Sequence, residues 1–219
     1  MFRVLLSLKK DASIKYISHL DLVRAFEYAL RRAKTPVAYS EGFNPRPKMS
    51  FGSAVGVGVS SDDERFIVEL VEPVNAAEIM NNLNANLPPG LQVLSAASVQ
   101  DGVKSPIGKL NASDFEITVS TSDMPVIREM IGSILESDEY RVTRAKANES
   151  KIVDIRPYII DIKMTDGVDG SAVITASFKS TNSGGGRPQD IIQVLCGTMS
   201  DIQIRNIRRI RQYEVPQTV

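Results

Sequence analysis

A strand followed by an amphipathic helix is predicted by FRVLLSLKKDASIKYISHLDLVRAFEYALRRAK, residues 2–34. Residues 2–9 alternate apolar and polar side chains, which is typical of a half-buried strand. Ser18 and Asp21 have the spacing of a capping box, so we expect the helix to begin at His19. The apolar stripe expected on this helix consists of Leu20, Val23, Phe26, Tyr28 and Leu30.

The same order of elements occurs twice and predicts the fold class. The first half continues with expected strands over 36–39, 54–59, 65–71 and 91–99 and a helix over 75–87. The second half has expected strands over 115–120, 140–145, 152–164, 172–178 and 202–210, and helices over 124–136 and 188–199. Each half has the order βαββαβ, which predicts an α+β protein built from a tandem pair of ferredoxin-like domains with antiparallel sheets. The expected domains are residues 1–104 and 105–219.

The segment SEGFNPRPKMSFG, residues 40–52, is the first candidate for a binding site. Two prolines flank Arg46 and restrict its backbone, so the segment predicts a rigid loop that presents a cation with Phe43 and Phe51. Such a loop suits a phosphate, a nucleobase or a carboxylate. The alternative is a connector whose two phenyl rings fill the core.

Charge is unevenly distributed, although the 26 basic and 26 acidic residues balance overall. Residues 1–50 hold ten Lys or Arg against four Asp or Glu, a net charge of +6. Residues 51–100 hold one against six, a net charge of −5. If the first helix and the loop around Arg46 lie together, they form a positive face that attracts polyanions. The alternative is two solvated surfaces of different charge.

Two later segments are weaker candidates for anion binding. Ser183-Gly-Gly-Gly-Arg187-Pro188 precedes a helix, where exposed backbone N–H groups hold phosphates, but three glycines also form ordinary turns. The last strand carries Arg209 among other arginines, which either follow a nucleic-acid backbone or protect a sheet edge. A bulge near residues 208–209 would direct the isoleucines of this strand inward.

His19 is the only histidine, and with Tyr16 it is the candidate proton carrier. Cys196 is the only cysteine, so no intramolecular disulfide and no cysteine-based metal or iron–sulfur site is expected. It lies in an apolar helical pattern and is expected to be a buried packing thiol. No metal site, no signal peptide and no membrane span are expected, so the predicted location is cytoplasmic.

Several motifs together resemble a known family. They are YISHLD (16–21), Arg24, YSEGFNPRP (39–47), SFG (50–52) and GVGVSSDDE (56–64). This combination resembles the radical-SAM-associated domain of unknown function, in the free-standing form of the domain that is also found fused behind radical-SAM modules. Arg187-Pro188 and residues 209–213 resemble the later motifs of that family. The resemblance implies a radical-SAM enzyme as partner, which would carry the S-adenosylmethionine and the iron–sulfur cluster, with no cofactor in this chain.

The leading interpretation is an RNA-binding or substrate-presenting partner of a radical-SAM enzyme, serving transfer or ribosomal RNA modification and not catalytic on its own. The expected phosphate contacts are Arg24, Arg46 and Lys48; the expected stacking residues are Tyr39, Phe43 and Phe51; and Arg187 and Arg209 extend the track. One alternative is an RNA-acting enzyme that uses His19, Tyr16 and Arg46. Another is a protein-binding adaptor that binds no nucleic acid.

Overall fold

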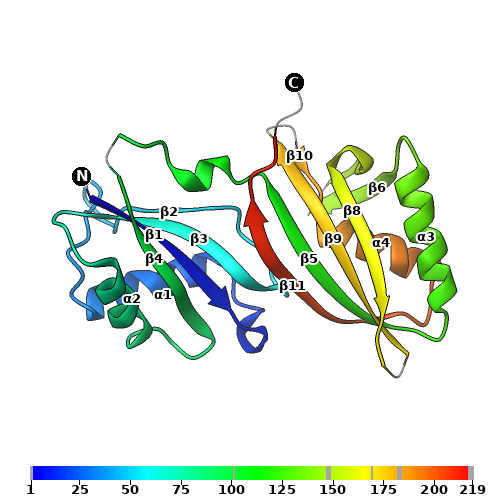
Figure 1. The fold of residues 1–219 in the computed structure, drawn as a ribbon, viewed down its shortest axis with the longest axis horizontal. Helices are drawn as coiled ribbons and strands as arrows, with labels where there is room; N and C mark the ends of the chain where they lie inside the picture. The colour runs from blue at the N-terminus through cyan, green and yellow to red at the C-terminus, as the bar shows by residue number, and fades with distance from the viewer. Residues whose placement is uncertain (1, 101, 147–148, 169, 182–183, 217–219) are drawn as a thin grey trace. The chain divides into compact units, whose positions relative to one another are not determined.

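The computed structural model describes residues 2–100, 102–146, 149–168, 170–181 and 184–216. The chain divides into two compact units, Met1–Leu110 and Asn111–Val219 (Figure 1). Both units combine helices with antiparallel strands, which confirms the expected α+β class. Within the described residues, no helix is long and apolar enough to cross a membrane.

The strands of the first unit form an antiparallel sheet in the order β4-β1-β3-β2. Leu6 lies at its centre, where it pairs with Phe66 on one side and Ala96 on the other. The elements are β1 (Phe2–Lys10), the 3-10 helix η1 (Ala12–Ile14), α1 (His19–Arg32), β2 (Met49–Phe51), β3 (Ser60–Leu70), α2 (Ala76–Asn84), β4 (Leu91–Val99) and the 3-10 helix η2 (Pro106–Lys109).

Helices α1 and α2 cover one face of this sheet (Figure 1), and the core lies between them and the strands. The rings of Phe26 on α1 and Phe66 on β3 are 4.6 Å apart. The prediction that Leu20 and Tyr28 belong to the buried stripe is wrong, since they are 65% and 54% exposed. The buried face of α1 instead follows positions i, i+4, i+7 and i+8 counted from Leu22, which share one face of a helix. The buried residues of α1 are Leu22, Phe26, Ala29 and Leu30.

The chain between α1 and β3 contains less strand than expected. Residues 36–39 make isolated bridges, Val37 with Leu70 and Tyr39 with Pro47, and residues 54–59 form no strand. The acidic segment 60–64, which separates the expected strands 54–59 and 65–71, is itself the beginning of β3. This part of β3 is stabilised by ion pairing, because the Arg65 Nε donates to Asp63 at 2.8 Å.

The main sheet of the second unit has the order β11-β5-β9-β8 and is also antiparallel. Strands β6 and β7 form a separate hairpin, and β10 pairs with the end of β9. The elements are β5 (Ala112–Ser120), α3 (Met124–Glu136), β6 (Arg141–Lys146), β7 (Glu149–Asp154), the 3-10 helix η3 (Arg156–Tyr158), β8 (Ile159–Asp166), β9 (Ser171–Thr181), β10 (Gly184–Gly185), α4 (Pro188–Thr198) and β11 (Gln203–Tyr213).

The expected single strand over 152–164 is wrong, because η3 divides it into β7 and β8. Pro157 lies in η3 and lacks the N–H that a continuous ladder needs. The guanidinium of Arg156 holds the break in place by donating to the carbonyls of Leu135 and Ser137, at 3.0 and 3.1 Å. These carbonyls lie at the end of α3, where helical hydrogen-bond partners are missing.

Candidate nucleic-acid interface

Helix α1 begins where the sequence predicts. Ser18 is the N-cap: its Oγ accepts from the Asp21 N–H at 3.2 Å, and its own N–H donates to the Asp21 carboxylate at 3.4 Å. The Ser18 hydroxyl also donates to the Asp21 carboxylate at 2.7 Å, and this bond, followed by the one from the Ser18 N–H, lowers the pKa of the Asp21 carboxyl below 3.8. With the apolar stripe facing the sheet, Arg24, Tyr28 and Arg31 lie on the exposed side of the helix.

The loop that contains Arg46 is closed at its base by hydrogen bonds. The Ser40 N–H donates to the Arg46 carbonyl at 2.9 Å, and the Arg46 N–H donates to the Ser40 Oγ at 3.0 Å. Beyond this closure, the Lys48 N–H donates to the Ala38 carbonyl at 2.8 Å. At the tip, Gly42 has a φ of 124°, which other residues rarely adopt. The backbone of the loop is therefore fixed independently of its exposed side chains.

A hollow of about 580 Å³ lies between this loop and α1. We call it the cationic hollow, and it is lined by Arg24, Glu27, Tyr28, Arg31, Asn44, Pro45 and Arg46. The lining therefore contains three guanidinium groups and one carboxylate. The expected proximity of Arg24 and Arg46 is found here, since segments twenty-two positions apart in the sequence line the same hollow.

The guanidinium groups of the hollow are accessible. Arg46 is exposed, and its side chain makes no hydrogen bond or ion pair within the described ranges. Arg24 meets Asp21 at 3.4 Å, but both side chains are more than half exposed, so the pair is weak. The guanidinium of Arg31 lies over the Tyr28 ring, 5.9 Å from its centroid. An incoming anion would therefore displace little internal bonding.

Sequence analysis missed Tyr28 and Arg31 as site residues. The available signal was their spacing: with Arg24, they occupy positions i, i+4 and i+7, which share one face of a helix. The sequence-based prediction instead places Tyr28 in the apolar stripe of the helix. Its exposure of 54% shows that it lies at the edge of the hollow and not in the core.

The three predicted stacking residues have different environments. Phe43, at the loop tip, is fully exposed, and Tyr39 is 42% exposed. Phe51 packs against the core: its ring stacks on Phe66 at 4.9 Å and meets the His19 ring edge-on at 5.2 Å. The expectation that Phe51 points outward is therefore corrected. Lys48 is half-buried and is not among the residues that line the hollow.

His19 and Tyr16, the predicted proton carriers, have different environments. His19 is the first residue of α1 and borders a cavity of about 10 Å³ together with Lys10 and Glu64, whereas Tyr16 is 71% exposed. The Nδ1 atom of His19 is buried and has no hydrogen-bond partner in the described part of the chain. The cavity holds no more than about one water molecule. A substrate is too large for it, so this geometry favours a packing role for His19.

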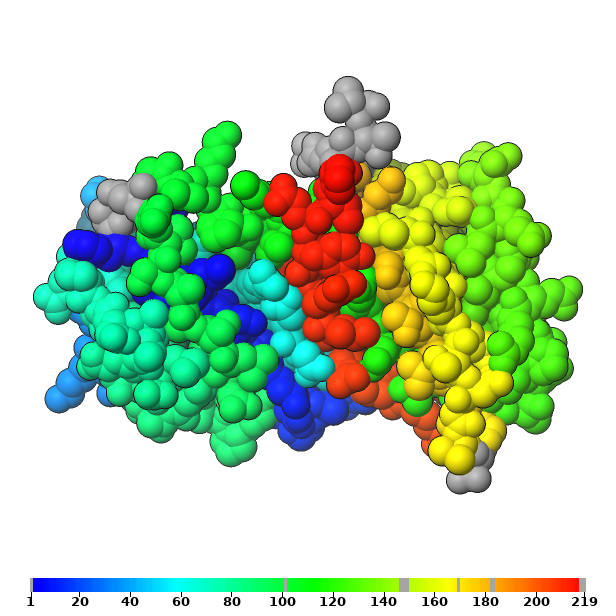
Figure 2. All heavy atoms as spheres, viewed as in Figure 1, coloured from blue at the N-terminus to red at the C-terminus, as the bar shows by residue number. Residues whose placement is uncertain are grey.

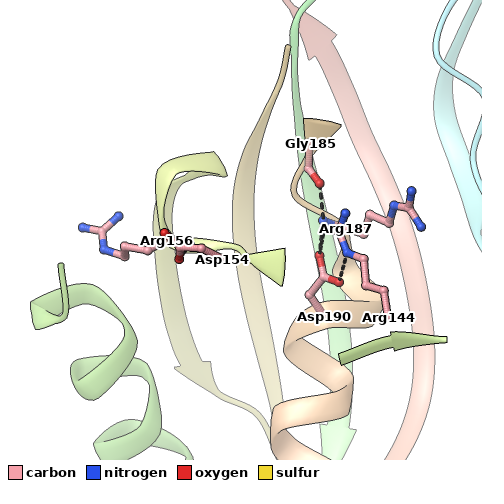
Figure 3. Close-up of polar contacts among 6 residues, drawn as sticks. All are labelled: Arg144, Asp154, Arg156, Gly185, Arg187 and Asp190. Atoms are coloured by element: carbon pink, nitrogen blue, oxygen red, sulfur yellow. Dashed lines mark hydrogen bonds and ion pairs between the residues drawn. The ribbon is translucent and has the colours of Figure 1, made fainter. Parts of the chain in front are cut away.

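Arg187 lies in the second unit, at the start of α4, and is exposed. Its backbone N–H donates to the Asp190 carboxylate at 2.9 Å, while its guanidinium points away from that carboxylate (Figure 3). Asp190 is buried and also accepts two bonds from Arg144, at 2.9 and 2.6 Å. Arg144 donates further to the Gly185 carbonyl at 2.7 Å. This N-terminus already holds an internal anion, so it does not need an external phosphate.

The glycines before α4 are required by packing. A Cβ at Gly184 would lie 2.9 Å from the Tyr158 hydroxyl, and one at Gly186 would lie 2.3 Å from the Phe178 ring. Phe178 is a buried core residue. Close approach to Tyr158 and to β9 therefore explains why this segment carries no side chains.

The arginines of β11 differ in exposure, since Arg205 and Arg211 are exposed and Arg209 is buried. Arg209 is 1% exposed, so its expected contact with RNA is corrected. Arg208 forms an ion pair with Glu116, and Arg211 pairs with Asp114 at 2.6 Å. The pairing register with β5 shifts between Arg209 and Arg211, close to the predicted bulge.

Asp114 on β5 carries a negative charge that side chains of β11 stabilise. Burial alone would raise the pKa of its carboxyl, but hydrogen bonds from Ser177, Arg211 and Tyr213 outweigh burial and lower that pKa. On the face of the sheet drawn in Figure 2, β11, β9 and β8 lie at the surface of the second unit. Asp114 and Glu116 alternate with the buried Phe115, so they lie on the side opposite the core.

Other sites in the described residues are less suited to a polyanion. A second hollow, of about 440 Å³, contains a single cation, Lys9, beside the carboxylate of Asp11. No cluster of three or more metal-ligating side chains occurs among the residues that the structure describes. Cys196 is exposed, so its predicted role as a buried packing thiol is wrong.

One of the matching solved structures has a TM-score above 0.5, at very low sequence identity. One chain of a Cbf5–Nop10–Gar1 complex has a TM-score of 0.53 and 10% identity, and the match covers 95% of this chain and 48% of that one. Chains of an H/ACA RNP bound to a substrate RNA containing 2′-deoxyuridine and of an archaeal box H/ACA sRNP Nop10–Cbf5 complex each have a TM-score of 0.48, at 10% and 8% identity. Those two matches each cover 94% of this chain and 46% of the other.

This chain therefore spans about half the length of those chains, and the likeness concerns the fold alone. No curated protein matches the chain. Residues 3–188 match DUF2344, and the chain therefore belongs to this family, which is described as an uncharacterized protein conserved in bacteria.

Proposed function

We propose that this protein binds RNA in the cationic hollow and presents it to a radical-SAM enzyme, without being catalytic on its own. The observation that carries the proposal is the convergence of Arg24, Arg31 and Arg46 on one hollow with an exposed tyrosine. Guanidinium groups bind phosphate oxygens through paired hydrogen bonds. Aromatic rings beside such groups provide surfaces on which bases stack.

The size and charge of the hollow support a nucleotide over a simple carboxylate. Its volume of about 580 Å³ lies within the range of roughly 300–1,000 Å³ that is usual for ligand sites. It contains three cations and one carboxylate, that of Glu27, and it lies in the segment of net charge +6. The field of such a segment attracts polyanions even when the whole chain is neutral.

The radical-SAM partnership rests on the sequence resemblance and on the cysteine content. With Cys196 as its only cysteine, this chain cannot supply the thiolates of an iron–sulfur cluster, so the partner would carry both the cluster and S-adenosylmethionine. The substrate would be transfer or ribosomal RNA. A single, exposed thiol is also compatible with the reducing cytoplasm, where we place the protein.

We also propose that the two units are ferredoxin-like. In chain order, the first unit contributes β1 to β4 in the spatial order β4-β1-β3-β2. Without the β6–β7 hairpin and β10, the second unit contributes β5, β8, β9 and β11 in the equivalent order β11-β5-β9-β8. This is the arrangement of a split βαβ unit with helices packed on the sheet. The boundary between the units would then lie between Leu110 and Asn111, near the predicted end of the first domain at residue 104.

RNA binding is tested by fluorescence anisotropy with labelled transfer RNA over a series of salt concentrations. We expect Arg46→Ala to weaken binding about 10- to 150-fold, because a hydrogen bond to a charged group contributes about 1.5–3 kcal/mol. The matched control is Lys104→Ala, which removes an exposed cation of the same unit outside the hollow. Equal affinity of Arg46→Ala and the wild type, or an equal loss in Lys104→Ala, contradicts the proposed site.

The partnership is tested by size-exclusion chromatography of the purified chain with a purified radical-SAM enzyme from the same organism. We expect co-elution in the presence of the RNA substrate. Treatment with nuclease distinguishes an assembly that depends on RNA from one held by protein contacts alone. Co-elution that survives nuclease, together with unchanged anisotropy of the RNA, would identify a protein-binding adaptor and would refute RNA presentation.

A further inference from the structure

We infer that the cationic hollow takes an unpaired segment of RNA, with a phosphate among the three arginines and the neighbouring base stacked on Phe43. This inference rests on the proposed function and adds the class of RNA. Two observations carry it: the full exposure of the Phe43 ring and the rigid closure of the loop that holds it.

Phe43 does not pack against the residues that the structure describes. It is fully exposed, and it makes no ring contact within the described ranges. Phe51, in the same loop segment, differs from Phe43, because its ring stacks on Phe66 and joins the core. An apolar ring held wholly in water loses the burial energy that phenylalanine normally contributes. A ring in this state is free to make a contact with a ligand.

The loop places the backbone of Phe43 beside the hollow. Phe43 directly precedes Asn44, which lines the hollow together with Pro45 and Arg46. Consecutive Cα atoms are about 3.8 Å apart, so the backbone of Phe43 lies at the rim. The bonds between Ser40 and Arg46 close the loop before any ligand arrives, which reduces the ordering cost of binding. One nucleotide is therefore able to meet the arginines with its phosphate and Phe43 with its base.

A double helix does not fit this arrangement. Bases in A-form RNA are already stacked and paired, and side chains cannot reach their faces. Unpaired bases in loops, bulges and ends are free to stack on aromatic side chains. Arg31 lies over the Tyr28 ring and adds a second flat surface in the same hollow. A site for phosphates alone would need the guanidinium groups and no exposed phenyl ring.

The experiment compares labelled oligouridine with an RNA hairpin of equal phosphate number, using anisotropy over a salt series. We expect the wild type to prefer the single strand, and Phe43→Ala to lose about 5- to 150-fold of that affinity, because stacking contributes this much per base. Phe43→Tyr keeps a ring and should retain the preference. The matched control, Phe2→Ala, removes another exposed phenyl ring of the same unit and should have no effect.

Two further readouts separate stacking from other roles. The salt dependence of Phe43→Ala should equal that of the wild type, since no phosphate contact is lost. A 2-aminopurine base in the single strand should be quenched by the wild type and not by Phe43→Ala. If hairpin and single strand bind equally while Arg46→Ala weakens both, the unpaired-RNA inference is wrong and the proposed function stands. If neither RNA binds, the proposed function itself is refuted, and Phe43 is left as a contact for a protein partner.

Discussion

Removal of the Asp190 carboxylate should destabilise the second unit strongly. The side chains of Asp190 and Arg144 are 3% and 17% exposed, and they are joined by two hydrogen bonds. Asp190→Ala leaves the guanidinium of Arg144 mostly buried and without its carboxylate. Breaking a buried pair in this way costs about 3–5 kcal/mol. The backbone N–H of Arg187 also loses its acceptor, which adds to the loss.

Urea unfolding followed by circular dichroism measures this effect. With a slope of about 1–3 kcal/mol per molar urea, the midpoint of Asp190→Ala should fall by about 1 M or more. The double variant Arg144→Met/Asp190→Ala should lose less than Asp190→Ala alone, because no charge remains buried. The control is Arg128→Met, which breaks the exposed pair with Asp166 and should cost about 0–1 kcal/mol. Equal midpoints for Asp190→Ala and Arg128→Met would refute the reasoning.

Two other predictions concern packing and acid stability. Gly186→Ala should lower the melting temperature, at a cost of about 1–3 kcal/mol, because its Cβ would lie 2.3 Å from the Phe178 ring. Gly197→Ala in α4 should raise the melting temperature, because nothing lies within 4 Å of the added Cβ and alanine favours the helix. Calorimetry that shows shifts of the same sign for both variants would contradict this account. The backbone N–H of Ser122, then its hydroxyl and that of Thr121, lower the pKa of the Asp201 carboxyl from 3.8 to about 2. A lowered pKa adds stability above pH 3.8, and this stability is lost as the pH falls toward about 2. The urea midpoint of Asp201→Asn should therefore change less than that of the wild type across this pH range. Equal pH dependence of the two midpoints would contradict the role given to Asp201.

Local signals in the sequence predicted the parts of the fold that depend on neighbouring residues. The spacing of Ser18 and Asp21 predicted the start of α1, and the structure contains that capping box. Helix α3 has the predicted bounds, Met124–Glu136, because Pro125 and a helical apolar pattern are both local. The antiparallel α+β class followed from the order of the elements alone.

Features that depend on partners far along the chain were not predictable. The sequence leaves two interpretations of the arginines of β11, a nucleic-acid track or the protection of a sheet edge. It does not contain the register that places Arg211 beside Asp114 and Arg208 beside Glu116. The break before β8 depends on Arg156 reaching the end of α3, which no local pattern contains.

The candidate site also contains one part that local sequence predicts and one part that depends on distant contacts. The rigid loop and its exposed Arg46 were predictable from Pro45 and Pro47, since prolines restrict the backbone locally. The opposite wall of the hollow was only partly predictable, because the phase of the buried face of α1 decides whether Tyr28 faces solvent. That phase is set by contacts with the sheet, such as the one between Phe26 and Phe66.

The reciprocal bonds between Ser40 and Arg46 have a consequence for protein engineering. They close the base of the apex, residues 41–45, whose backbone needs the glycine at position 42 but no particular side chain at Phe43 or Asn44. Randomised libraries at Phe43 and Asn44 should accordingly yield folded variants with altered ligand preference.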